Sequence, residues 1–201
     1  QRDLAIAEYA DGGLHLSGLS CAESVELVRQ AKARGIDVTA DVAIANLVGT
    51  DSDIESYDTA VKLLPPLRSK LDQESLWEGV LDGSIDMIVS DHDPMDHELK
   101  NCEWGSASFG AATIEQCFSW YCAMRSDRPA LEAWVEAVAH RPRTLFGLGS
   151  VTVNIGSPAD FTLFHVEGQL SGKSSLGVNV PTWPQQGCAI GTVLDEVASK
   201  A

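Results

Sequence analysis

Leu81-Asp82-Gly83-Ser84-Ile85-Asp86-Met87-Ile88-Val89-Ser90-Asp91 is the stretch of sequence that decides the fold. Its Asp-Gly pair ends a predicted helix that begins at Ser69 and runs to about Leu81. The apolar run Ile85–Ser90 that follows has the length of a buried strand. A helix that leads directly into such a strand is typical of an α/β fold, because parallel strands are joined by crossover helices.

The same alternation precedes this stretch. Ser20-Cys21-Ala22-Glu23 has the form of a helix capping box, and apolar residues then recur at helical spacing up to a C-capping Gly35. Strands are predicted on either side of this helix, at Leu14–Leu16 and Ile36–Val42. The pattern therefore predicts an α/β fold with a parallel sheet.

The chain after the sheet shows two further predicted helices, at 112–124 and 130–139, and then a change of pattern. From residue 151 onward apolar and polar residues alternate, with predicted strands at 151–155, 161–166, 178–180 and 190–194 and no helix between them. We therefore predict two domains with a boundary near Gly149: residues 1–149 and a β-rich appendix at 150–201.

Composition narrows the class of protein. The chain has 201 residues, of which 44% are hydrophobic and 21% charged, as in ordinary globular domains. Its net charge of −15 argues against binding to nucleic acid or to anionic membranes. No apolar run approaches the roughly 18 residues of a membrane helix.

Five cysteines without a CxxC pair favour free thiols in a reducing cytoplasm. The chain starts without Met or a signal peptide, so we expect the natural protein to extend upstream.

Titratable side chains gather after one predicted strand. In parallel α/β barrels, functional groups lie just beyond the C-terminal ends of strands, and here that position carries Ser90-Asp91-His92-Asp93-Pro94-Met95-Asp96-His97. Asp91 is a candidate general base or metal ligand, and His92 and His97 are candidate ligands. The alternative is a solvated acidic loop, because a metal centre needs three or four converging ligands and the other strand ends offer none.

A second candidate lies in Lys62-Leu63-Leu64-Pro65-Pro66-Leu67-Arg68, which its two prolines make rigid. Such a segment could direct Arg68 at an anionic substrate. It could equally be a stiff connector with Arg68 in a surface ion pair. The residues alone leave both interpretations open.

Several of these segments, taken in order, resemble the signatures of dihydroorotases. The matching segments, with Phe109-Gly110 and Glu115 between the last two, are 20–25, 58–68, 81–86, 90–94 and 155–161. The resemblance implies the C-terminal half of a TIM (β/α)8 barrel followed by part of a small β-sandwich built from both chain ends. It also implies reversible closure of N-carbamoyl-aspartate to dihydroorotate, with zinc as the metal and an aspartate that shuttles the proton.

The same resemblance reveals substitutions at the expected site. The family has metal-binding histidines at the positions of Gly18 and Ala45, and substrate-binding Asn and His at those of Leu64 and Met95. Asp91 aligns with the proton-shuttling aspartate. Gly, Ala and Leu supply neither a ligand nor a hydrogen bond, so a standard two-metal site is not expected.

Three hypotheses follow. The first is a non-catalytic homologue that serves as a structural or regulatory partner, assembled with aspartate transcarbamoylase or as a homo-oligomer. The second is an amidohydrolase with a reduced site, with one metal held by upstream histidines, Asp91 as base, and His92 or His97 assisting. The third is a protein that binds another ligand in the altered pocket.

Overall fold

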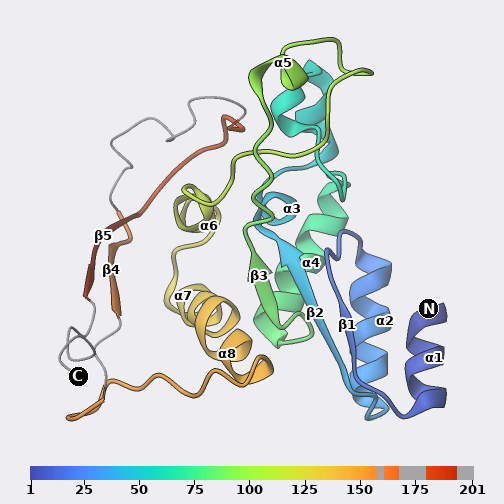
Figure 1. The fold of residues 1–201 in the computed structure, drawn as a ribbon, viewed down its shortest axis with the longest axis vertical. Coiled ribbons are helices and arrows are strands. Elements are labelled where there is room, and N and C mark those ends of the chain that lie inside the picture. Colours follow the sequence, from blue (N-terminus) through green and yellow to red (C-terminus); the bar gives the residue numbers. More distant parts are fainter. Residues whose placement is uncertain (158–160, 168–179, 194–201) are drawn as a thin grey trace, which may run out of the picture.

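The structure, a computed structural model, describes residues 1–157, 161–167 and 180–193. A parallel sheet with helices along it forms one side of the molecule, and a two-stranded ribbon lies on the other (Figure 1). Along the chain the helices and strands are α1 (Arg2–Ala10), β1 (Leu14–Leu16), α2 (Ala22–Ala33), β2 (Val38–Ala43), α3 (Ile44–Val48), η1 (Asp51–Ser56), η2 (Thr59–Val61), α4 (Lys70–Asp82), β3 (Met87–Val89), α5 (His97–Lys100), α6 (Cys117–Met124), α7 (Arg128–Val135), η3 (Glu136–His140), α8 (Arg141–Leu145), β4 (Phe161–His165) and β5 (Cys188–Val193).

The sheet confirms the predicted α/β fold. Its order is β1-β2-β3, and both pairings are parallel, with Leu14 opposite Val38 and Asp41 opposite Met87. All three predicted strands are present, although β2 and β3 each begin two residues later than predicted. Helices α2 and α4 provide the crossovers, so the carboxyl ends of the three strands meet at one edge.

Packing of α2 against α4 closes the core on one face of the sheet. Val25 and Val28 of α2 are buried together with Leu76 and Val80 of α4. The two helices come close at Gly79, where an added Cβ would lie 2.9 Å from a Val25 methyl carbon. Any larger residue at Gly79 would therefore separate the helices.

Helix α4 begins and ends as its sequence predicts. Ser69 and Asp72 form a complete capping box, and Gly83 closes the helix with φ of 81°. The predicted capping box of α2 is wrong, because its N-cap is Cys21, which makes no side-chain cap bond. The first turn of α2 is held instead from α4, where the Asp72 carboxylate accepts the Ala22 N–H at 2.9 Å.

The two later helices differ from their predicted bounds. The helix predicted from residue 112 begins only at Cys117. In the segment before it, the backbone N–H groups of Thr113 and Ile114 donate to Nδ1 of His92. The helix predicted at 130–139 begins at Arg128 behind an Asp127 cap and continues through the π-helical turn η3 into α8.

The C-terminal part is partly as predicted. Strands β4 and β5 pair antiparallel, with a bulge between Leu163 and Phe164. The predicted strand at 151–155 is wrong: this segment has no strand partner within the described residues and leaves Ile155 fully exposed. Residues 178, 179 and 194 of the other two predicted strands lie outside the described residues.

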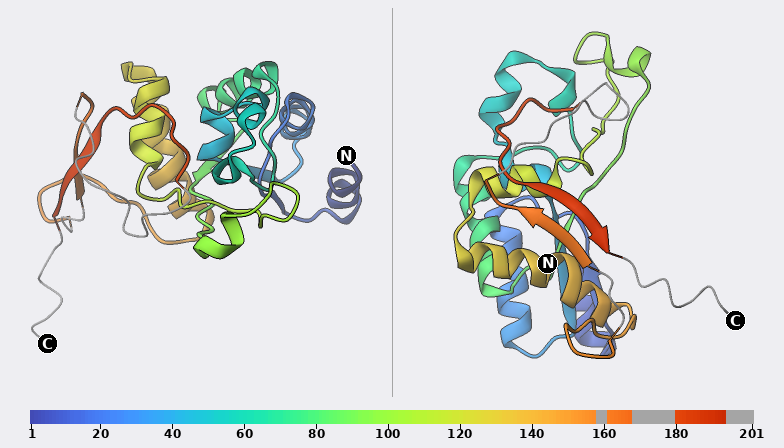
Figure 2. Two further views of the ribbon diagram at one scale, coloured as in Figure 1. Left: turned by 90° about the horizontal axis from the view of Figure 1, so that it is seen from above. Right: turned by 90° about the vertical axis from the view of Figure 1, so that its left-hand side faces the viewer.

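The ribbon lies on the opposite side of the molecule from α1, with α6 and α7 between it and the sheet (Figure 2). Trp183, just before β5, is nevertheless buried in the main core against Trp120, with ring centroids 5.0 Å apart. The domain boundary at 149/150 stays a prediction. Among the described residues, no helix combines the length and apolar character that crossing a membrane requires.

Candidate functional site

The carboxyl ends of the three strands carry the positions singled out from the sequence. Gly18 follows β1, Ala45 lies in α3 directly after β2, and Asp91 follows β3. Asp91 has a left-handed backbone conformation, with φ of 48°. Ala45 is buried in the core, whereas Asp91 is exposed to solvent.

The carboxyl group of Asp91 is electrostatically perturbed. Partial desolvation by its surroundings is the largest cause, followed by the negative charges of Asp93 and Asp41, and together they raise its pKa. No arginine or lysine offsets these effects among the causes of the shift. Ionisation of Asp91 is therefore less favourable in the folded protein than in the unfolded chain.

Asp91→Asn is expected to stabilise the protein at neutral pH. Because the folded-state pKa of Asp91 is raised, its contribution to stability is fully present below the unfolded-state pKa and is lost as the pH rises through the folded-state value. Asparagine does not titrate and accepts the same left-handed backbone. Urea unfolding at neutral and at acidic pH should show the gain at neutral pH alone, and a gain that does not depend on pH would contradict this assignment.

Among the described residues, the other predicted site residues do not form a metal-ligand cluster with Asp91. Nδ1 of His92 is already occupied, because it accepts the N–H groups of Thr113 at 3.0 Å and Ile114 at 3.2 Å. His97 is the exposed first residue of α5. Arg68 is exposed near the start of α4. The pKa of Asp72 is lowered mainly by the hydrogen bond from Ser69, and the charge of Arg68 makes only the smallest contribution.

Sequence reasoning missed a polar network inside the sheet. Asp41 of β2 is buried, and its carboxylate bonds Nε2 of His15 at 2.9 Å and accepts the Gly18 N–H at 2.7 Å. The other ring nitrogen of His15 bonds the Thr39 hydroxyl at 2.8 Å. Thr39 and Asp41 are two residues apart on β2, a spacing that places both on the same face of the strand and could have indicated the network.

This network fixes the loop that begins at Gly18. The residue has φ of 70°, and an added Cβ would lie 3.4 Å from Cδ of Pro65, which is ordinary contact. Backbone conformation, not space, therefore makes glycine the favoured residue here.

Gly18→Ala is expected to lower the free energy of unfolding by about 1–2 kcal/mol, because a Cβ disfavours the left-handed conformation. Thermal or urea unfolding measures the loss. Gly12→Ala is the control: its φ lies outside the left-handed region and an added Cβ meets no atom within 4 Å. Equal stability of the two variants would contradict the role given to the Gly18 backbone.

Two buried lysines form a second feature that sequence reasoning missed. Nζ of Lys62 donates to the carbonyl oxygens of Trp104 and Ala107, each at 2.6 Å. Nζ of Lys100 donates to those of Thr59 at 2.6 Å and Ser108 at 3.0 Å. Burial and the nearby Lys62 lower the pKa of Lys100. Both ammonium groups therefore bind the backbone of residues 104–108, the segment that follows α5.

The donor groups at this edge do not fit the zinc site that the resemblance implies. Among the described residues, no three His, Cys, Asp or Glu side chains come together as metal ligands. Gly18 and Ala45 have no side-chain atom that could bind a metal. The carboxylate of Asp41 is already hydrogen-bonded to His15 and to the backbone of Gly18. Asp91 thus lacks converging ligands from β1 and β2.

Two known proteins with similar sequences are both named dihydroorotase. The chain is 38% identical over 193 residues to the dihydroorotase of Leifsonia xyli, covering 90% of this chain and 43% of the relative. It is 36% identical over 208 residues to the dihydroorotase of Bacillus subtilis, covering 97% of this chain and 49% of the relative. This chain is a dihydroorotase homologue. It spans less than half the length of these curated relatives, and no protein-family model matches it.

Solved structures place this dihydroorotase homologue among the amidohydrolases. The L-hydantoinase (dihydropyrimidinase) of Arthrobacter aurescens superimposes with a TM-score of 0.85 at 27% identity, covering 98% of this chain and 46% of that one. The dihydropyrimidinase of Brevibacillus agri superimposes with a TM-score of 0.83 at 25% identity, covering 96% of this chain and 46% of that one. The dihydroorotase homologue therefore has the fold of these solved structures over the part of their chains that it covers.

Proposed function

We propose that this chain is the C-terminal half of a dihydroorotase-type TIM barrel, followed by part of a β-sandwich, and that it serves as a non-catalytic structural partner. The proposal is supported by one contrast: the hydrogen bonds that hold the loops are present, whereas the side chains that would bind a metal are not. The His15–Asp41–Gly18 network and the buried Lys62 and Lys100 keep the strand-end loops ordered, while Gly18 and Ala45 carry no ligand atom.

The substrate positions support the same proposal. Leu64 and Met95 replace the Asn and His that the family resemblance implies, and the Leu64 side chain is 66% exposed. A leucine side chain cannot donate a hydrogen bond to the carboxylate of N-carbamoyl-aspartate. The site has therefore lost polar contacts to substrate as well as metal ligands.

Zinc titration of the purified chain tests the loss of the metal site. We expect no saturable binding by calorimetry, with the zinc content after dialysis the same in wild type and Asp91→Asn. One tightly bound zinc per chain, reduced by the substitution, would overturn the proposal.

The raised pKa of Asp91 favours one alternative, an amidohydrolase with a reduced site. A carboxyl group with a raised pKa at a strand end has the character of a general acid or base. In this alternative Asp91 moves the proton, Arg68 and either His92 or His97 bind the substrate, and the metal ligands come from outside this chain. Dihydroorotate hydrolysis by the full-length protein, lost in Asp91→Asn, would support it. Equal inactivity of both proteins is the outcome that our first proposal predicts.

Assembly follows from the proposed structural role. We propose aspartate transcarbamoylase as the partner, or a homo-oligomer of this protein, in a cytoplasmic setting. Copurification with a transcarbamoylase from cells that express the full-length protein tests the hetero-complex, and a protein that elutes alone as a monomer would count against both assemblies.

A further inference from the structure

Buried polar side chains in the described part of this chain are paired almost without exception. The indole N–H of Trp77 donates to the carbonyl oxygen of Leu47 at 2.7 Å. The hydroxyl of Tyr121 donates to the carbonyl oxygen of Ala130, also at 2.7 Å. Such pairing is expected, because a buried polar group without a partner destabilises the folded state.

Two atoms of helix α6 are the exceptions. Among the described residues, the buried side-chain atoms without a hydrogen-bond partner are Oε1 of Gln116 and Nε1 of Trp120. Gln116 is only 6% exposed, and Trp120 is fully buried. The backbone N–H of Trp120 donates to the carbonyl oxygen of Gln116 at 2.8 Å, so the two residues lie one helical turn apart on the same face. Both exceptions therefore fall at one place in the core.

The two atoms have complementary hydrogen-bonding character. The amide oxygen of Gln116 can only accept a hydrogen bond, and the indole N–H of Trp120 can only donate one. They do not bond each other in the structure, so neither satisfies the other. A molecule that supplies one donor and one acceptor between them would satisfy both, and water is the smallest such molecule.

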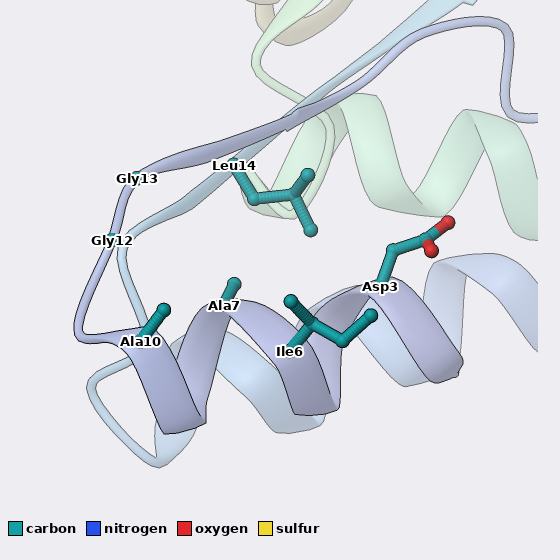
Figure 3. Close-up of a pocket in the computed structure, with 7 residues that line it drawn as sticks. All are labelled: Asp3, Ile6, Ala7, Ala10, Gly12, Gly13 and Leu14. Atoms are coloured by element: carbon teal, nitrogen blue, oxygen red, sulfur yellow. The ribbon is translucent and has the colours of Figure 1, made fainter.

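The surface hollow between α1 and β1 contains no such pair of atoms (Figure 3). Its volume is about 360 Å³, and apolar residues and glycines line it everywhere except at Asp3. The carboxylate of Asp3 is half exposed and pairs with Arg2 at 2.9 Å. The residues that line this hollow therefore include no buried polar group in need of a partner, in contrast with the buried face of α6.

We propose that one internal water molecule binds at the buried face of α6, where it donates a hydrogen bond to Oε1 of Gln116 and accepts one from Nε1 of Trp120. Internal waters are part of folded structures, and they satisfy buried polar groups that have no partner in the protein. Burial limits the ligand to a molecule of this size, because both side chains are closed off from solvent.

This water has a structural consequence. The ring of Trp120 packs edge-to-face on that of Trp183, with ring centroids 5.0 Å apart. A water bound to Nε1 of Trp120 holds this ring in place relative to Gln116 at the start of α6. The site therefore links the start of α6 to the C-terminal segment that carries Trp183.

Cross-relaxation between water and protein protons, measured by NMR on the purified chain, tests the proposal. A water molecule that stays bound for longer than the protein takes to tumble gives an NOE to a nearby proton with the sign of a bound molecule. We expect this NOE at the Nε1 proton of Trp120. The Nε1 proton of Trp77 is the matched control and should show no such NOE, because it is also buried but donates to the Leu47 carbonyl.

Two glutamine variants test whether Gln116 is the second partner of the water. Gln116→Met keeps the length of the side chain but removes the amide oxygen, so the NOE at Trp120 should be lost. Gln30→Met is the control: Gln30 is exposed on α2 and bonds Glu26 at 2.7 Å, so the NOE should be unchanged. Circular dichroism checks that Gln116→Met is folded, and Gln116→Leu takes its place if it is not.

Each outcome decides the proposal. An NOE at Trp120 that Gln116→Met abolishes and Gln30→Met retains supports the bridging water. No NOE at Trp120 in the wild-type chain, or an equal NOE at Trp77, overturns it. An NOE that survives in Gln116→Met also overturns it, because the water would then not be held between the two residues.

Discussion

Lys62→Met is expected to lower the free energy of unfolding by about 3 kcal/mol, because it leaves buried backbone carbonyls without a donor. Nζ of Lys62 lies 2.6 Å from the carbonyl oxygens of both Trp104 and Ala107 and 4.9 Å from the ring centroid of Phe109. Methionine has a similar length and keeps the packing of the stem but provides no hydrogen bond. Urea unfolding measures the loss, and hydrogen exchange should rise over residues 104–110.

Lys70→Met provides the control for this prediction. Lys70 is exposed and bonds Gln73 at 2.6 Å, so its loss should change stability by less than about 0.5 kcal/mol. If the two lysine variants were equally stable, the carbonyl contacts of Lys62 would not hold the loop. If Lys62→Met lowered the free energy of unfolding without faster hydrogen exchange over residues 104–110, the loss of stability would not come from this segment.

Trp183→Ala is expected to cost about 3–5 kcal/mol, the range for removal of a large buried aromatic side chain. The Trp183 ring packs on Trp120, and Nε1 donates to the carboxylate of Asp53 at 3.1 Å. It also lies against Gly49, where any side chain would collide with it. Thermal unfolding with both tryptophan fluorescence and circular dichroism measures the change.

Trp183→Phe separates packing from the hydrogen bond. Phenylalanine retains most of the ring but lacks the N–H, so a loss of about 1 kcal/mol is expected. Tyr9→Ala removes an aromatic side chain that is 93% exposed and should change stability little. A Trp183→Ala protein that unfolds like wild type would mean that the C-terminal segment does not contribute to the main core.

Features set by neighbouring residues were predictable from the sequence. Helix α4 has both its ends encoded locally, in Ser69 with Asp72 and in Gly83. Asp91 could be placed at a strand end for the same reason, since the apolar run of β3 directly precedes it. These signals lie within a few residues of the structure they determine.

Features set by distant residues were not predictable in this way. The segment before α6 is held by His92, which accepts the backbone N–H of Thr113, 21 residues further along the chain. Lys62 reaches carbonyl groups more than forty residues away, and every residue type carries a carbonyl. The expectation that Gly18 and Ala45 replace metal ligands rests on the family resemblance alone, because neither residue shows by itself what it replaces.

The left-handed backbone at Asp91 changes what the presence of this aspartate means. Aspartate, asparagine and glycine are the residues that adopt such a conformation at low cost, so the turn after β3 restricts the side chain whether or not any chemistry takes place. A degenerating enzyme could lose every ligand and still keep this carboxylate, because replacing it would strain the turn. When related sequences are sorted into active and inactive copies, this aspartate is therefore a weak criterion, and the residues at positions 18 and 45 are the informative ones.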